Sequence, residues 1–174
     1  MSAIVARRQA EHLLQRFHIK TPSICVDKIA DELRLKVVRK SLRNVSGLLV
    51  LGDAGRATIC VNVDHEPYRQ RLAVAHEIGH YHLQHQLKPG KKFFIDEGYF
   101  ISQRGARAVD GVDPIEIEAT QFALALLMPT VLLRASVVAL QCALLLDFHV
   151  AGLAGMFEVP EQAMTVRLST LGYL

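Results

Sequence analysis

One predicted helix places two histidines on its apolar face, and this constrains the fold more than any other feature of the 174-residue chain. Residues 67–86 keep the three- and four-residue spacing of apolar positions that is typical of an amphipathic helix. One stripe along this helix consists of Leu72, His76, Gly79, His80 and Leu83. Because the rest of the stripe is apolar or small, we expect it to face the core, with both imidazoles inside the protein and one turn apart.

The two histidines belong to the segment His-Glu-Ile-Gly-His at residues 76–80. Histidines four residues apart on a helix can bind the same ion, and a catalytic zinc site has three protein ligands and a water. Glu77 lies about 100° around the helix from His76, where it can take a proton from that water as general base. We therefore predict a zinc centre with His76 and His80 as ligands and Glu77 as the catalytic residue. The alternative is a pair of hydrogen-bonded core histidines.

Gly79 stands in the middle of the same helix. Glycine there costs about 1 kcal/mol relative to alanine. A packing reason, such as the close approach of another element, is therefore expected.

The third ligand has to come from elsewhere in the chain. The longer pattern HExxHxxGxxH is excluded, because it would need glycine and histidine where the sequence has Leu83 and Gln86. A carboxylate from a later helix is the remaining common solution.

Two glutamates near the start of a helix predicted for residues 113–128 are candidates for this ligand. Asp113 and Glu116 have the spacing of a capping box, which gives Glu116 a structural role. Glu118 falls on the apolar face, where a carboxylate needs a partner such as a metal ion. That face comprises Ile115, Ala119, Phe122, Ala125 and Leu126. We favour Glu118 as the third ligand and keep Glu116 as the alternative.

The remaining elements predict an α+β fold. Helical spacing occurs at residues 3–17 and around 27–33, and an apolar helix follows Pro129. Short runs rich in β-branched residues or leucine indicate a small meander, and another run indicates an edge strand. The meander strands are residues 35–40, 46–51 and 57–63, and the edge strand is 91–95. We expect a sheet of about three to four strands packed on helices, a domain at residues 1–145, and a helical extension at 146–174 packed on it.

Two segments of the chain carry a family resemblance. They are RLAVAHEIGH at residues 71–80, and IEATQFA at 117–123 followed by LLMP at 126–129. They resemble the ImmA/IrrE family of metallo-endopeptidases, which has an RFTLAHELGH-like segment and then an EANxFAxxLLMP-like one. The match extends to a strand at residues 46–48 and to Asn62, where the family has a strand ending in asparagine. This sequence departs from the pattern at Thr120, where asparagine or aspartate is usual, and at Gln84, where histidine is common.

The resemblance implies a zincin-like fold, zinc ligation by His76, His80 and Glu118, and Glu77 as base. It also implies an endopeptidase that cleaves a helix-turn-helix repressor of mobile-element or stress genes, so that the protein partner is a transcription factor. The alternative is a regulatory binding module that captures a repressor without hydrolysing it.

Composition indicates in which compartment the protein acts and which kind of partner it binds. Three cysteines without a CxxC spacing, and a start that lacks a signal-peptide core, indicate the reducing cytoplasm. Residues 119–133 form the longest uncharged stretch, which contains a proline and is shorter than the roughly 20 residues of a membrane span. The net charge is only +3, and residues 153–168 have helix-turn-helix spacing with Arg167 as their one basic residue. We therefore expect a protein partner, no membrane and no direct DNA contact.

Three further residues are candidates for substrate contact. His85 or Tyr99 could supply a hydrogen bond to the transition state, and Arg104 could steer an acidic substrate stretch or stabilise an oxyanion. Tyr99 and Arg104 lie in residues 96–113, which show no helical or strand period and are predicted to be a loop over the site.

Overall fold

The structure is a computed structural model that describes residues 2–52, 56–87, 93–96, 113–142 and 144–174. These residues form an α+β fold, as predicted, with a mixed sheet and seven helices. The strands are β1 (Leu35–Lys40), β2 (Gly47–Leu51), β3 (Ala57–Asn62) and β4 (Phe93–Asp96). The helices are α1 (Ala3–Arg16), α2 (Val26–Glu32), α3 (Pro67–His82), α4 (Pro114–Leu127), α5 (Thr130–Ala139), α6 (Asp147–Phe157) and α7 (Glu161–Thr170).

The strand order differs from the predicted meander. The order is β1-β3-β2-β4, with β1 parallel to β3, and with β2 antiparallel to both β3 and β4. The meander prediction was wrong because β3 lies between β1 and β2. The predicted edge strand is present as β4, next to β2.

A buried asparagine holds the connector that produces this order. Asn62, at the end of β3, is fully buried, and its Oδ1 accepts hydrogen bonds from the backbone N–H groups of Leu42 and Asp64. Its Nδ2 donates to the carbonyl oxygens of Arg43 and Val45, at 3.1 and 2.9 Å. These contacts fix the β1–β2 connector against the end of β3. The chain can then leave β1 on one side of β3 and return as β2 on the other.

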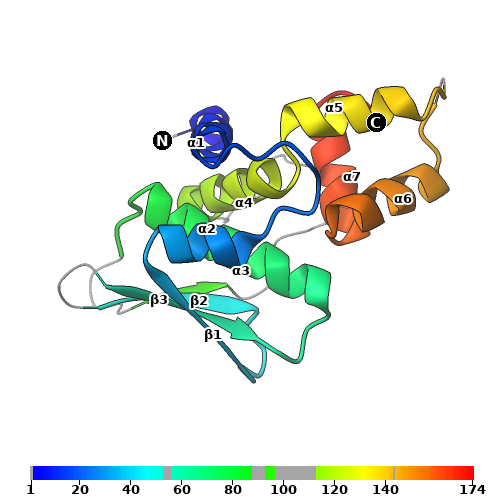
Figure 1. Ribbon diagram of the computed structural model, residues 1–174. Coiled ribbons are helices and arrows are strands. Elements are labelled where there is room, and N and C mark those ends of the chain that lie inside the picture. Colours follow the sequence, from blue (N-terminus) through cyan, green and yellow to red (C-terminus); the bar gives the residue numbers. More distant parts are fainter. Residues whose placement is uncertain (1, 53–55, 88–92, 97–112, 143) are drawn as a thin grey trace.

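The helices form layers above one face of the sheet (Figure 1). Helices α2 and α3 pack on the strands, and α4 packs between α3 and α1. Helix α3 is therefore enclosed by the sheet below and by α4 above. Its residues from Leu72 to His80 are all buried, so burial includes the predicted stripe and extends beyond it to the other sides of the helix.

The C-terminal helices α6 and α7 share the core of the rest of the chain. Their buried apolar residues, among them Phe157 and Leu168, belong to the same hydrophobic cluster as those of α3 and α4. Arg167, the one basic residue of α7, is 1% exposed. Its guanidinium donates hydrogen bonds to the Met128 carbonyl and to the Thr130 hydroxyl. This arginine therefore faces the interior and is not offered to DNA.

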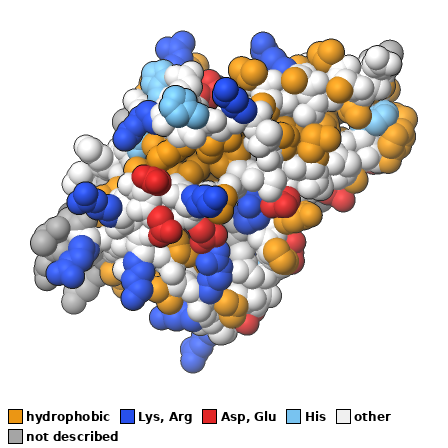
Figure 2. Space-filling view, viewed as in Figure 1, with side chains coloured by type: hydrophobic (Ala, Val, Ile, Leu, Met, Phe, Trp, Pro, Cys, Tyr) orange, Lys and Arg blue, Asp and Glu red, His pale blue; other side chains and the backbone are white. Residues whose placement is uncertain are grey.

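Large apolar side chains remain exposed on α5, on α6 and on the connector between them, which we call the α5–α6 apolar face. It consists of Val131, Val138, Leu144, Leu146, Phe148 and Met156. Figure 2 shows hydrophobic side chains gathered over this end of the molecule. Exposed apolar patches of this kind are typical of interaction surfaces.

In the described part of the chain, no single helix is both long and apolar enough to cross a membrane. Helices α4 and α5 reach that length and hydropathy only as a pair that is bent by 53°.

Candidate metal centre

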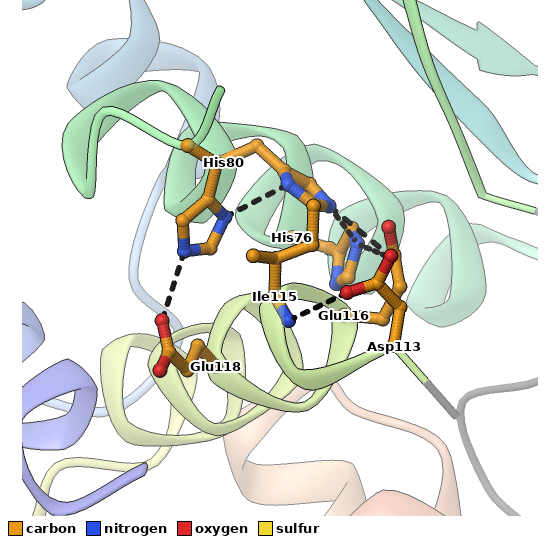
Figure 3. A network of polar contacts seen from close by, with 7 residues as sticks. His76, His80, Asp113, Ile115, Glu116 and Glu118 are labelled. Carbon is orange, nitrogen blue, oxygen red and sulfur yellow. Dashed lines mark hydrogen bonds and ion pairs between the residues drawn. The ribbon is translucent and has the colours of Figure 1, made fainter. Parts of the chain in front are cut away.

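Helix α3 carries the histidine pair into the interior. The helix begins with Pro67 in its first turn, preceded by Glu66, whose carboxylate accepts a hydrogen bond from the Tyr68 N–H. His76 and His80 are each 1% exposed. Both imidazoles therefore lie inside the protein on the side of α3 that faces α4 (Figure 3).

Helices α3 and α4 approach most closely at Gly79. A Cβ atom placed there would lie 3.1 Å from the Ala119 carbonyl oxygen and 3.2 Å from the Ala119 Cα. Both distances are shorter than ordinary contacts of a Cβ atom, and they involve backbone atoms that cannot rotate away. The expected packing reason for this glycine is thereby confirmed. Because the two backbones touch, side chains of α4 that neighbour Ala119 can reach the histidines.

Three side chains converge on one point at this crossing. His76 Nε2 and His80 Nε2 are 2.8 Å apart, and the Glu116 Oε2 atom lies 3.2 Å from the first and 3.3 Å from the second. Figure 3 shows Glu116 beside the two rings. Among the described residues, these three form the group of histidine, cysteine and carboxylate side chains arranged to hold a metal ion.

The structure brings Glu116, and not the favoured Glu118, to the histidine pair. Asp113 caps α4 by accepting a hydrogen bond from the Ile115 N–H at 3.2 Å, while the Glu116 side chain turns toward the histidines instead of completing a capping box. Glu116 lies three residues before Ala119 and therefore on the same side of α4 as the helix crossing. The apolar stripe of the sequence indicated the other glutamate, because it marks a buried side of α4 and not the side that faces α3.

Glu118 lies against a different histidine. Its Oε2 is 3.2 Å from His85 Nε2, and His85 Nδ1 is 3.0 Å from His80 Nδ1. We predicted His85 as a candidate for substrate contact. The structure places it behind His80, with both ring nitrogens engaged and an exposed fraction of 9%. Tyr99 and Arg104, the other two candidates, lie outside the described residues.

Glu77 lies on the side of α3 that faces the start of β2, about 100° around the helix from His76. It is fully buried, and a Cβ atom on Gly47 of β2 would lie 3.3 Å from Glu77 Oε1 and 3.4 Å from Ala73 Cβ. The absence of a side chain at residue 47 thus leaves room for the carboxylate at the start of β2. Sequence reasoning noted Gly47 only through the family resemblance and did not predict this contact.

The electrostatics of His76 and Glu116 favour the protonation states that bind a metal. Burial lowers the pKa of His76 to about 4, although its hydrogen bond with Glu116 acts in the opposite direction. Burial alone would raise the pKa of Glu116, but the hydrogen bonds with His76 and His80 outweigh it and hold that pKa well below the usual value. At neutral pH, His76 is thus a neutral imidazole and Glu116 a carboxylate, which are the forms that bind zinc.

The spacing of the donor atoms fits a single ion. Ligands at about 2.0–2.1 Å from a tetrahedral zinc lie about 3.3 Å from one another. Both separations that involve Glu116 Oε2 match this value, and the two Nε2 atoms are somewhat closer. Two imidazole nitrogens and one carboxylate oxygen are also the donor set of a common catalytic zinc site.

Among the three converging side chains, Glu116 is the most exposed. The Glu116 side chain is 31% exposed, whereas those of His76 and Glu118 are 1% and 6% exposed. A catalytic metal site needs an open position for water and substrate. Because Glu116 is the one of the three in appreciable contact with solvent, water would reach a bound metal from its side.

Comparison with known proteins agrees with this geometry. Residues 30–169 match the model of the M78 peptidase family, described as the IrrE N-terminal-like domain. The matched range contains α3 and α4, and therefore the whole histidine and glutamate cluster. A search among curated proteins found no match. The match over most of its length, together with the zincin-like arrangement of α3 and α4, shows that this chain belongs to the M78 peptidase family.

Proposed function

We propose that this protein is a zinc-dependent endopeptidase. The observation that carries the proposal is the convergence of His76, His80 and Glu116 in a chain of the M78 peptidase family. Glu77 follows the first of these ligands on the same helix. A divalent metal such as zinc would supply Lewis acidity for the attacking water and the scissile carbonyl.

The residues of the chain would divide the reaction between them. His76, His80 and Glu116 would hold the metal, and Glu77 would accept the proton of the attacking water at its carboxylate. The same carboxyl group would then donate that proton to the nitrogen of the leaving amine. Gly47 would leave the space in which the Glu77 carboxylate lies.

The proposed substrate is a helix-turn-helix repressor, whose cleavage would derepress mobile-element or stress-response genes. Three features support a protein partner over DNA. The net charge is only +3, Arg167 of α7 is buried, and the α5–α6 apolar face offers an exposed surface for protein contact. The choice of repressor rests on the resemblance to the ImmA/IrrE family.

Metal analysis of the purified protein, combined with cleavage of a candidate helix-turn-helix repressor, tests this proposal. We compare the wild type with Glu77→Gln, which removes the base but keeps the shape of the side chain. Glu32→Gln, at an exposed position of α2, is the matched control. We expect one zinc ion per chain in all three proteins. Cleavage should be lost only in Glu77→Gln.

Two results would contradict the proposal. Absence of bound metal after zinc repletion would exclude the centre, and undiminished cleavage by Glu77→Gln would exclude the mechanism. If the zinc-loaded wild type captures the repressor without cleaving it, the protein is a regulatory binding module instead.

A further inference from the structure

A buried row of polar side chains leads away from the metal centre behind His80. The row runs from His80 Nδ1 to His85 Nδ1 at 3.0 Å, and from His85 Nε2 to Glu118 Oε2 at 3.2 Å. His80, His85 and Glu118 are 1%, 9% and 4% exposed. Their hydrogen bonds are therefore shielded from water. In such a buried environment a hydrogen bond holds the orientation of a side chain most strongly.

The direction of each hydrogen bond follows from the atoms involved. The His80 ring turns its Nε2 toward His76 and Glu116, so this atom must be unprotonated to bind a metal. The proton of a neutral His80 then lies on Nδ1, which donates to His85 Nδ1. His85 consequently carries its own proton on Nε2, and it donates this proton to the Glu118 carboxylate. This assignment satisfies both contacts of the row, His80 to His85 and His85 to Glu118, with two neutral rings.

Local structure explains how His85 reaches this place. Helix α3 ends at His82, and Gln84 adopts a left-handed backbone conformation with φ 55°. The chain then turns back, so that the His85 N–H donates to the His80 carbonyl oxygen at 3.1 Å. The turn at Gln84, one of the departures from the family pattern, thus sets the second ring behind the first.

We propose that His85 and Glu118 form a positioning relay that holds His80 in the tautomer and orientation whose Nε2 binds the metal. Such hydrogen-bonded partners fix the ring of a metal-binding histidine and increase its basicity. Neither residue would touch the metal or the substrate. The inference rests on the metal site of the proposed function, but it does not depend on peptide cleavage.

The zinc affinity of the metal-free full-length chain tests the relay. Competition with a chromophoric chelator would give the dissociation constant of the wild type and of three variants. His85→Phe keeps a ring but removes both hydrogen bonds, and we expect its dissociation constant to rise about 10- to 100-fold. His85→Gln retains an acceptor and a donor, so its loss should be less than about tenfold. His82→Phe is the matched control on the same helix end and should stay within about twofold of the wild type.

A second measurement detects the hydrogen bond between His80 and His85 directly. In the zinc-loaded wild type labelled with nitrogen-15, we expect a scalar coupling across the hydrogen bond between His80 Nδ1 and His85 Nδ1. This measurement needs no variant, so it remains decisive if His85→Phe fails to fold. Absence of the coupling, or unchanged zinc affinity of a folded His85→Phe, would overturn the relay.

The relay and the proposed function fail in distinguishable ways. One outcome is that the wild type binds zinc tightly, His85→Phe binds it more weakly, and the wild type does not cleave the repressor. This outcome would support the relay and contradict the peptidase. If the wild type cleaves the repressor and His85→Phe has unchanged zinc affinity, the peptidase is supported and the relay is contradicted.

Discussion

Replacing Gly79 with alanine should separate the two helices that build the metal centre. The new Cβ would meet the Ala119 carbonyl oxygen at 3.1 Å, the Ala119 Cα at 3.2 Å and the Phe122 Cδ1 at 3.2 Å. Ordinary contacts of a Cβ atom begin near 3.4 Å. Because two of the three obstructing atoms belong to the α4 backbone, α3 and α4 must move apart by a few tenths of an ångström. Glu116 would move with α4, away from the histidine pair.

Two opposing terms set the effect on stability. Alanine is favoured over glycine in a helix by about 1 kcal/mol, whereas inserting a methyl group into a tightly packed contact costs about 1–3 kcal/mol. Gly152→Ala on α6 isolates the first term, because a Cβ atom there would meet nothing within 4 Å. The free energy of unfolding of Gly79→Ala should therefore be about 1–3 kcal/mol below that of Gly152→Ala.

Urea denaturation of the metal-free chain and zinc competition measure the two consequences. A movement of a few tenths of an ångström exceeds the tolerance of about 0.2 Å for metal–ligand distances. We expect about tenfold weaker zinc binding in Gly79→Ala and unchanged binding in Gly152→Ala. If Gly79→Ala is as stable as Gly152→Ala and binds zinc like the wild type, the backbone contact does not position Glu116 and the reasoning is refuted.

Three further substitutions test other parts of the structure. Gly47→Ala should displace the Glu77 carboxylate from β2 and lower kcat about tenfold, while zinc affinity stays within about twofold of the wild type. An unchanged kcat would show that Gly47 does not position the carboxylate. Asn62→Ala removes the four hydrogen bonds of a buried side chain and should lower the free energy of unfolding by about 3 kcal/mol in urea denaturation. A loss below about 1 kcal/mol would argue against its role in holding the β1–β2 connector. Val138→Asp, at a side chain that is 73% exposed, should weaken repressor binding in a pull-down or titration without lowering stability by more than about 0.5 kcal/mol. Unchanged binding would exclude this part of the α5–α6 apolar face as a contact surface.

The histidine pair could be predicted from sequence because both rings fall on one stripe of the helix, although the structure buries every residue of α3 from Leu72 to His80. The 3.6-residue period placed His76 and His80 together, and the glycine between them indicated the close approach that the structure shows at Ala119. Both inferences needed only local spacing.

The glutamate that meets the histidine pair could not be predicted in the same way. Helix α4 lies between α1 and α3, and Glu118, Ala119 and all residues of the helix from Gln121 onward are buried. A helix that is apolar on two opposite sides has no single stripe to indicate which side faces the histidines. The close approach of Gly79 and Ala119 determines which side of α4 faces the histidines, and this contact exists only in the folded chain.

The strand order also depends on a contact that is remote in sequence. Runs rich in β-branched residues or leucine identified the strands, but such runs carry no information on which strand lies between two others. Asn62 decides the order by holding the β1–β2 connector through residues 17 to 20 positions away. The resemblance pointed to this asparagine without indicating its hydrogen bonds.

The most direct test of the central claim, that Glu116 completes the metal site of His76 and His80, is zinc affinity in Glu116→Gln and Glu118→Gln measured side by side. We predict that Glu116→Gln weakens zinc binding by more than about 100-fold, because it removes a ligand, whereas Glu118→Gln weakens it by about tenfold or less. A larger loss in Glu118→Gln than in Glu116→Gln would show that the other carboxylate binds the metal and would contradict the account.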